Sequence, residues 1–167
     1  MIFGMTTFTA FHVLLSLVGI LSGLVVVVGL LSANSMSGWT LLFLGTTLAT
    51  SVTGFFFPIH GLTPALGVGI LSILILVPTI AARYSFHLVG AWRWGYVVGA
   101  VTALYFNSFV LVVQSFLKIP ALHALAPAGS EPPFVLTQGI VLAFYLVIGF
   151  LAVRKFHPVS PGVMLPA

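Results

Sequence analysis

Cysteine and aspartate are absent from this chain of 167 residues, and Glu131 is its only acidic residue. The absence of cysteine excludes disulfides, thiolate metal sites and thiol redox chemistry. A single carboxylate likewise excludes a catalytic pair of acids and a carboxylate cage for Mg²⁺ or Ca²⁺. No GxSxG, HExxH or Walker motif is present either, so the sequence contains no pattern that predicts an enzyme.

Charge is scarce as well. Charged residues make up 4% of the chain, whereas soluble domains carry about 25%. Hydrophobic residues make up 60%, and the mean hydropathy is +1.29. Such a composition excludes a soluble globular domain, a coiled coil and a disordered tail, and it predicts a polytopic membrane protein. The pI near 10.0 comes from five basic residues scattered along the sequence, which excludes a nucleic-acid partner.

Five continuous apolar segments are long enough to cross a bilayer, which takes about 20 residues in a helix. They run from about Phe8 to Leu31, Trp39 to Phe57, Pro64 to Ala82, Trp94 to Leu117 and Phe134 to Val153. We therefore predict an all-α membrane bundle with five transmembrane helices. It forms one domain over residues 1–157, and an extended proline-rich tail follows over residues 158–167.

The basic residues predict how the bundle is inserted. Arg83 and Arg93 share one connection, and Arg154 and Lys155 follow the last span. With five spans these two regions lie on the same side of the membrane, and an excess of Lys and Arg marks the cytoplasmic side. The N-terminus is therefore predicted outside and the C-terminus inside.

Polar residues inside the predicted spans recur at helical spacing. Asn107, Gln114 and Lys118 fall within about 40° of arc on the fourth span, and Gln138 and Tyr145 share a face of the fifth. Because amides are costly in lipid, we predict that Asn107, Gln114 and Gln138 point into the bundle. Similar faces occur in the first two spans, at His12, Ser16, Gly19 and Gly23 and at Thr46, Thr50 and Thr53.

The predicted topology places His12, Gln114 and Gln138 near the outer ends of three spans. An imidazole in a span needs a hydrogen-bond partner, a metal or a cofactor. We therefore predict a polar site around His12, with the two glutamines as neighbours and Asn107 and Tyr145 as further candidate ligand contacts. The alternative is a His12 that hydrogen-bonds a neighbouring helix and holds no ligand.

The connection from Lys118 to Pro133 carries four prolines and is long enough to fold back over the bundle. We predict that it forms the lid of the site around His12. A Lys118–Glu131 ion pair would close this loop, with a contribution of at most about 1 kcal/mol because the pair is exposed.

Several ligands suit such a site. A single axial His12 can hold a haem or a chlorin, and Ser16 and Gly19 beside it leave room for a flat ring. Amides, a tyrosine and a histidine can hydrogen-bond a quinone or a lipid headgroup. Neutral imidazole also suits Zn or Cu, although no HxH or HxxxH pair is present. The candidate metal ligands are His12, His60, His123 and Glu131.

One stretch of the chain carries a resemblance to a known family. It begins as Tyr105-Phe106-Asn107-Ser108-Phe109-Val110-Leu111-Val112-Val113-Gln114-Ser115-Phe116 and continues through Lys118, Pro120 and Leu125-Ala126-Pro127 to Ser130-Glu131-Pro132-Pro133-Phe134. In this segment the sequence resembles an uncharacterised family of small bacterial integral membrane proteins. The resemblance implies a multi-pass protein of the bacterial inner (cytoplasmic) membrane, and it brings no activity, cofactor or catalytic residue with it.

Three functions remain open from the sequence. Few polar groups and short connections favour an accessory or structural subunit of a membrane complex or of a homo-oligomer. The second function is a binder of an apolar cofactor, quinone or lipid in the outer half of the bundle. The third is a channel or transporter, which the lack of an internal repeat and of an acidic residue inside a span disfavours.

Overall fold

The structure is a computed structural model that describes residues 6–57 and 64–157. This part of the chain forms six helices and no strand, which confirms the predicted all-α fold. The helices are α1 (Thr7–Leu31), α2 (Ser37–Gly54), α3 (Pro64–Tyr84), α4 (Ala91–Lys118), α5 (Pro120–His123) and α6 (Pro132–Lys155). The predicted tail over residues 158–167 lies outside the described residues.

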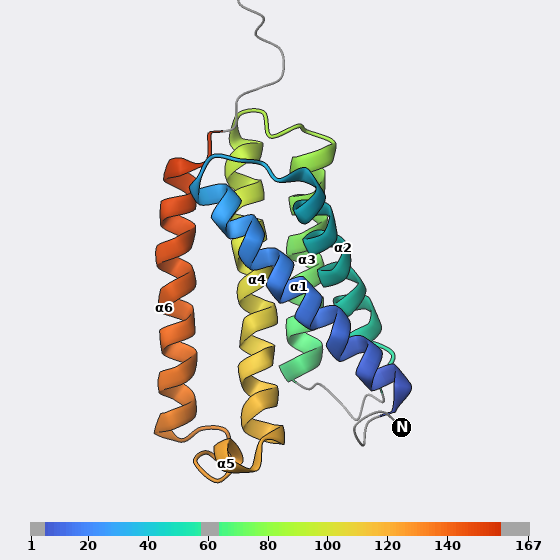
Figure 1. Cartoon of the computed structure of the whole chain (residues 1–167), viewed down its shortest axis with the longest axis vertical. Coiled ribbons are helices and arrows are strands. Elements are labelled where there is room, and N and C mark those ends of the chain that lie inside the picture. Colours follow the sequence, from blue (N-terminus) through green and yellow to red (C-terminus); the bar gives the residue numbers. More distant parts are fainter. Residues whose placement is uncertain (1–5, 58–63, 158–167) are drawn as a thin grey trace, which may run out of the picture.

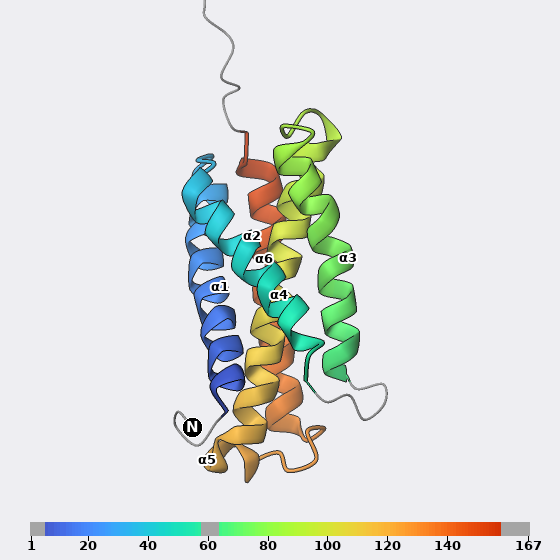
Figure 2. The ribbon, with the colours of Figure 1, turned by 90° about the vertical axis from the view of Figure 1, so that its right-hand side faces the viewer.

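The five long helices run in alternating directions, and α4 lies at the centre of the bundle (Figures 1 and 2). Its neighbours are α1, α2, α3 and α6, whereas α6 packs against α4 and α1. Helix α1 crosses the bundle obliquely, so it starts on the side of α2 and α3 and finishes beside α6 (Figure 1). We call the end at which α3 and α6 finish and α4 begins the basic end, because Arg83, Arg93, Arg154 and Lys155 lie there.

Four helices are long and apolar enough to cross a membrane: α1, residues Leu66–Tyr84 of α3, α4 and α6. The chain is therefore built as a multi-pass membrane protein. Helix α2, with 18 residues, is not among the four. Serine and threonine lower its apolarity, at Ser37, Thr40, Thr46, Thr47, Thr50, Ser51 and Thr53. By length and apolarity the described residues therefore give four candidate spans, and α2 as a fifth span stays a prediction.

The helix ends differ from the predicted bounds by a few residues. Helix α2 ends at Gly54, three residues before the predicted Phe57, because the N–H groups of Phe55 and Phe56 bond to carbonyls three residues earlier and tighten the last turn. The short helix α5 lies inside the predicted loop and has Pro120 at its start, where a missing N–H costs nothing.

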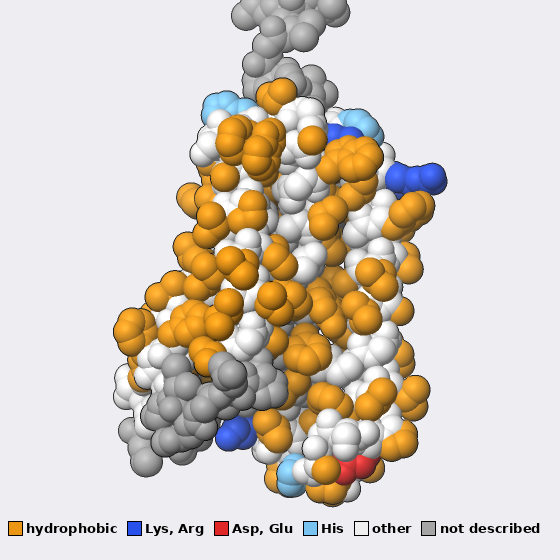
Figure 3. Space-filling model, turned by 180° about the vertical axis from the view of Figure 1, so that it is seen from behind, with side chains coloured by type: hydrophobic (Ala, Val, Ile, Leu, Met, Phe, Trp, Pro, Cys, Tyr) orange, Lys and Arg blue, Asp and Glu red, His pale blue; other side chains and the backbone are white. Residues whose placement is uncertain are grey.

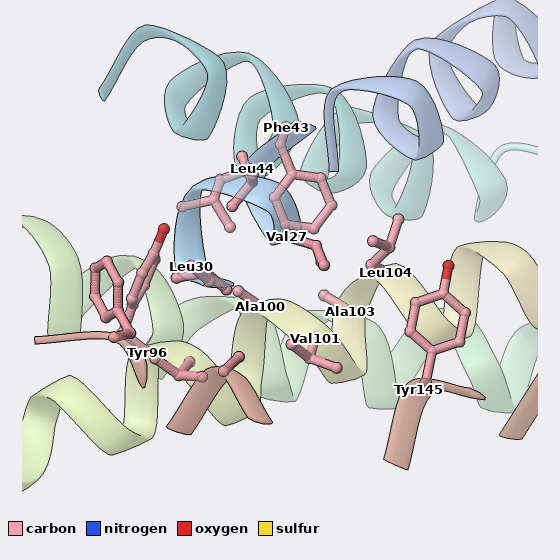
Figure 4. Packing of buried hydrophobic residues seen from close by; sticks show 14 of the residues in the cluster. Val27, Leu30, Phe43, Leu44, Tyr96, Ala100, Val101, Ala103, Leu104 and Tyr145 are labelled. Atoms are coloured by element: carbon pink, nitrogen blue, oxygen red, sulfur yellow. The ribbon is translucent and has the colours of Figure 1, made fainter. Parts of the chain in front are cut away.

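The apolar core lies where α1, α2 and α4 meet, with contributions from α3 and α6. Leu30, Phe43, Leu44 and Leu104 are almost completely buried there. Figure 4 shows these side chains between the three helices, with Tyr145 of α6 on another side of α4. Many other large apolar side chains are exposed, as a bilayer requires, among them Leu21, Leu74 and Ile140.

Helices α3 and α4 approach each other most closely at Gly99. A Cβ atom at this position would lie 1.9 Å from Thr79 Oγ1 and 3.1 Å from Thr79 Cβ. Thr79 is buried, and its hydroxyl donates to the carbonyl of Ile75 within α3. A small residue at position 99 is therefore needed for this contact, in the way that glycine allows close helix packing in membranes.

Polar side chains from three helices meet at the basic end. Arg83 donates to Ser37 Oγ at 3.0 Å, and its guanidinium lies 5.8 Å from the centre of the Tyr96 ring. The Tyr96 hydroxyl is hydrogen-bonded to Thr40 Oγ1 at 3.2 Å, and both residues are buried. These contacts join α2, α3 and α4.

Arg93 joins α4 to α6 at the same end. Its guanidinium donates to the carbonyl oxygen of Val153 at 3.2 Å and to that of Phe156. The last carbonyls of a helix have no partner within the helix, and a cation beside them also interacts favourably with the helix dipole. Arg93 therefore caps the C-terminal end of α6.

Candidate functional site

His12 lies in the second turn of α1 and contacts α2. Its Nδ1 atom is 2.8 Å from Thr53 Oγ1, and its ring packs edge-on against Phe57 with 5.0 Å between ring centres. Phe8 packs against the same Phe57 ring at 5.0 Å. The half-buried imidazole is therefore held between a hydroxyl group and aromatic rings at the end opposite to the basic end.

The Thr53 hydroxyl also lies within hydrogen-bond distance of its own helix, 2.7 Å from the carbonyl of Ala49 and 3.1 Å from that of Thr50. When its proton is donated to Ala49, its oxygen accepts from His12 Nδ1, and a neutral ring then carries its lone pair on Nε2. No described residue hydrogen-bonds to Nε2.

Asn107 lies halfway along α4 and points into the bundle, as predicted. Its Nδ2 atom donates to Thr47 Oγ1 at 3.1 Å. A Cβ atom at Gly19 of α1 would lie 3.3 Å from Asn107 Nδ2 and 3.2 Å from Thr47 Oγ1. Asn107 thus fills a three-helix contact in which Gly19 leaves the space for the amide, and its role here is packing.

Gln138 and Tyr145 join α6 to α4. The Ser108 and Tyr145 hydroxyls share a hydrogen bond of 2.7 Å, and Gln138 Nε2 donates to the carbonyl of Phe109 at 3.2 Å. The inward orientation predicted for Gln138 is thereby confirmed. Its Oε1 atom is buried, and no hydrogen-bond partner for it is present among the described residues.

An open groove of about 320 Å³ runs along the α4–α6 contact. Apart from the paired hydroxyls of Ser108 and Tyr145, its lining is apolar, with Leu111, Ile140 and Phe144 among the residues. The groove therefore suits a hydrocarbon chain better than a polar ligand.

The position of Gln114 contradicts the prediction of a single polar site around His12. Its side chain is exposed, which contradicts the predicted inward orientation. His12 contacts α2, Gln138 contacts α4, and the starts of α1 and α6 lie on opposite sides of α4 (Figure 1). Helical spacing predicted the inward orientation correctly for Asn107 and Gln138. It did not predict the neighbours of His12, because the oblique path of α1 takes this residue away from the two glutamines.

The connection between α4 and α6 also differs from the predicted lid. Helix α5 packs against α4 and lies below α4 and α6 in Figure 1, away from the start of α1. Glu131 accepts the backbone N–H groups of Ala128 at 2.9 Å and Ser130 at 3.0 Å, so its two carboxylate oxygens stabilise its own loop in place of the predicted pair with Lys118. The hydrogen bond from Ala128 is the main cause that lowers the pKa of Glu131 below its ordinary value of 4.5.

The candidate metal ligands are not gathered in the described part of the chain. No group of three or more His, Cys, Asp or Glu side chains lies close enough together there to hold a metal ion. His123 is exposed on α5, Glu131 is bonded to its own loop, and His60 lies outside the described residues. Among the described candidates, His12 alone lies within a helix long and apolar enough to cross a membrane.

Sequence reasoning missed the roles of Arg93 and Tyr96. The sequence predicts Arg93 only as part of a basic connection between two spans, and it gives no partner for Tyr96. Arg93 binds backbone carbonyls, which every residue has, so no side-chain pattern in the sequence identifies its partner. Thr40, the partner of Tyr96, lies 56 residues away, and only the tertiary contact between α2 and α4 pairs them.

Comparisons of the chain with protein-family models, with curated proteins and with solved structures gave no match.

Proposed function

We propose that this protein is an accessory or structural subunit of the bacterial inner membrane that acts through lateral contacts with other membrane subunits or with further copies of itself. The observation that carries the proposal is the use made of its polar side chains. Those of the membrane helices bond either to carbonyls of their own helix, as Ser22 and Thr79 do, or to other helices, as in the pairs Asn107–Thr47, His12–Thr53, Ser108–Tyr145 and Thr40–Tyr96. Such a protein uses its polar groups to hold its own shape.

The surface offered to a partner is that of α6. Of its 24 residues only Tyr145 and Ala152 are buried. Large apolar side chains are exposed along its length, at Val135, Leu136, Ile140, Phe144, Leu146, Val147 and Phe150. Since α6 joins the bundle through α4 and part of α1, most of its circumference is free to contact lipid or a neighbouring membrane helix.

A photo-crosslinking amino acid at Ile140 tests this proposal. The matched control is Leu74 on α3, since the two side chains are 69% and 64% exposed. We expect a cross-linked product of one defined mass from position 140, and cross-links to lipid alone from position 74. Only lipid products from both positions, together with a monomeric mass in native membranes, would contradict a lateral partner.

The same proposal includes five spans with the N-terminus outside. At about 1.5 Å per residue, the 18 residues of α2 extend for about 27 Å, close to the hydrocarbon thickness of a bilayer. Helix α2 also lies between α1 and α3 and runs antiparallel to both (Figure 2). The chain lacks cysteine, so single cysteines placed at Ser35 and Ser130 report the topology. Ser130→Cys should react with an impermeant reagent from outside and Ser35→Cys should not; the reverse pattern contradicts the orientation.

The second candidate function, binding of an apolar ligand, rests on the Nε2 lone pair of His12. An imidazole that donates from Nδ1 and is free at Nε2 is in the state that ligates a haem or chlorin metal, and it also accepts a hydrogen bond from a quinol hydroxyl. The rings of Phe8 and Phe57 beside it suit a flat apolar ligand.

Mild-detergent purification of the wild type and of His12→Phe separates these ligands. A visible absorption band lost in the variant supports a haem or chlorin, and loss of an extracted quinol supports the hydrogen-bonded ligand. Identical spectra and identical extracted lipids in the two preparations would contradict this second function.

A further inference from the structure

Four of the five Lys and Arg residues lie at the basic end, and the single acidic residue lies at the other. Figure 3 shows blue side chains near the finish of α6, while the red Glu131 is at the opposite end of the molecule. The basic end therefore carries positive charge that no acidic side chain neutralises.

Arg93, Arg154 and Lys155 lie close together within this region. Because Arg93 bonds to the carbonyls of Val153 and Phe156, its guanidinium lies within about one helical turn of residues 154 and 155. Arg154 and Lys155 are exposed. The Arg154 guanidinium lies over the Phe150 ring at 4.7 Å, which orients it without neutralising it.

The depth of these cations in the membrane is indicated by aromatic residues. Trp39, Trp92 and Trp94 are all exposed, and each lies in the first turn of a helix that begins at the basic end. Exposed tryptophan marks the boundary between the hydrocarbon and the headgroups of a bilayer. The three cations are thus at the level of lipid phosphates.

We propose that Arg93, Arg154 and Lys155 form a binding site for the headgroup of an anionic phospholipid, between the start of α4 and the end of α6. The phosphate supplies the negative charge that the chain lacks there, and the acyl chains lie along the exposed apolar side chains of α6. This site does not depend on the proposed accessory role or on the direction of insertion, since it requires only that the basic end meets a leaflet.

Native mass spectrometry from nanodiscs of phosphatidylcholine mixed with phosphatidylglycerol tests the site. The wild type should retain phosphatidylglycerol preferentially. Each Lys or Arg near the surface contributes about 1 kcal/mol, a factor of about five, so the double variant Arg154→Gln/Lys155→Gln should bind about 25-fold more weakly. Lys118→Gln, which removes the cation of the opposite end, is the matched control and should retain phosphatidylglycerol like the wild type.

Two further measurements make the result decisive. Arg154→Lys keeps the charge and should keep the retention, and thermal unfolding in pure phosphatidylcholine checks that the double variant folds like the wild type. Equal retention of both lipids by the wild type, or an equal loss in Lys118→Gln, would overturn the site. Complete displacement of the lipid by inorganic phosphate would show a bare anion site and would overturn the lipid assignment.

Discussion

The two ends of the bundle are held together by different kinds of contact. At the basic end, side chains link different helices: Arg83 reaches α2, Tyr96 reaches Thr40, and Arg93 caps α6. At the opposite end the links between helices come from neutral side chains, His12 to Thr53 and Gln138 to the carbonyl of Phe109, and Glu131 bonds within its own loop. A chain with very few charged residues thus uses two of them, Arg83 and Arg93, to connect helices at the basic end.

This difference indicates where the bundle is rigid and where it can adapt. Contacts between helices that are far apart in sequence constrain the arrangement of the whole bundle, whereas a bond within one loop constrains that loop alone. We therefore expect substitutions of Arg93 and Tyr96 to lower the free energy of unfolding of the whole bundle, and substitution of Glu131 to act locally.

The largest loss of stability is expected from Gly99→Ala, in the half of α4 that lies nearer to the basic end. The new methyl group would overlap Thr79, and rotation of that side chain gives no relief because Thr79 Cγ2 would also lie only 3.3 Å from the added Cβ. We expect a loss of about 1–3 kcal/mol, as in overpacked cores. Gly95→Ala is the control, since no atom lies within 4 Å of its added Cβ. Equal unfolding midpoints for the two variants in mixed micelles would contradict the close α3–α4 contact.

Arg93→Gln should have the next largest effect, because it removes the cap from the end of α6. A hydrogen bond from a charged group contributes about 1.5–3 kcal/mol, and partial exposure of Arg93 places the expected loss at about 1–2 kcal/mol. In zwitterionic detergent, Arg154→Gln should leave stability nearly unchanged, because the α6 carbonyls stay bonded to Arg93. A loss from Arg154→Gln as large as that from Arg93→Gln would mean that charge, and not capping, stabilises this end.

Tyr96→Phe is expected to cost about 0.6 kcal/mol, the average for a polar contact between membrane helices. The variant keeps the ring and its packing against Phe156 but loses the hydrogen bond to Thr40. Tyr105→Phe provides the control, since Tyr105 makes ring contacts and no side-chain hydrogen bond with a described residue. If both variants unfold at the same denaturant concentration, the Thr40–Tyr96 bond contributes nothing measurable.

The smallest effect is expected at the opposite end, from Glu131. Its pKa is lowered in the folded loop, so the bonds from the N–H groups of Ala128 and Ser130 are fully present above the ordinary pKa of 4.5 and are lost as pH falls through the lower folded value. Amide hydrogen exchange of Ala128 and Ser130 should accelerate over that range relative to the intrinsic rate, while global unfolding stays unchanged. Glu131→Gln should abolish this pH dependence; a pH-dependent global unfolding of the wild type that disappears in this variant would contradict a purely local role.

Much of the architecture follows from the sequence alone. Continuous apolar runs define the helices because a chain in lipid must satisfy its backbone hydrogen bonds within each segment. The same reasoning placed Asn107 and Gln138 inside the bundle, since an unpaired amide in hydrocarbon is costly. It failed for Gln114 because a residue near the end of a span can reach the polar interface and needs no partner inside.

The tertiary structure alone decided which residues meet. Helical periodicity defines the face on which a residue lies but not the helix that the face contacts, and the oblique path of α1 pairs His12 with Thr53 in place of the two glutamines. Likewise, the sequence predicts Arg93 and the end of α6 on one side of the membrane, but only the packing of α6 against α4 brings Arg93 to the carbonyls of Val153 and Phe156. Composition and periodicity are properties of a segment, and they determined a membrane bundle; partners are properties of the packing between segments, and they required the fold.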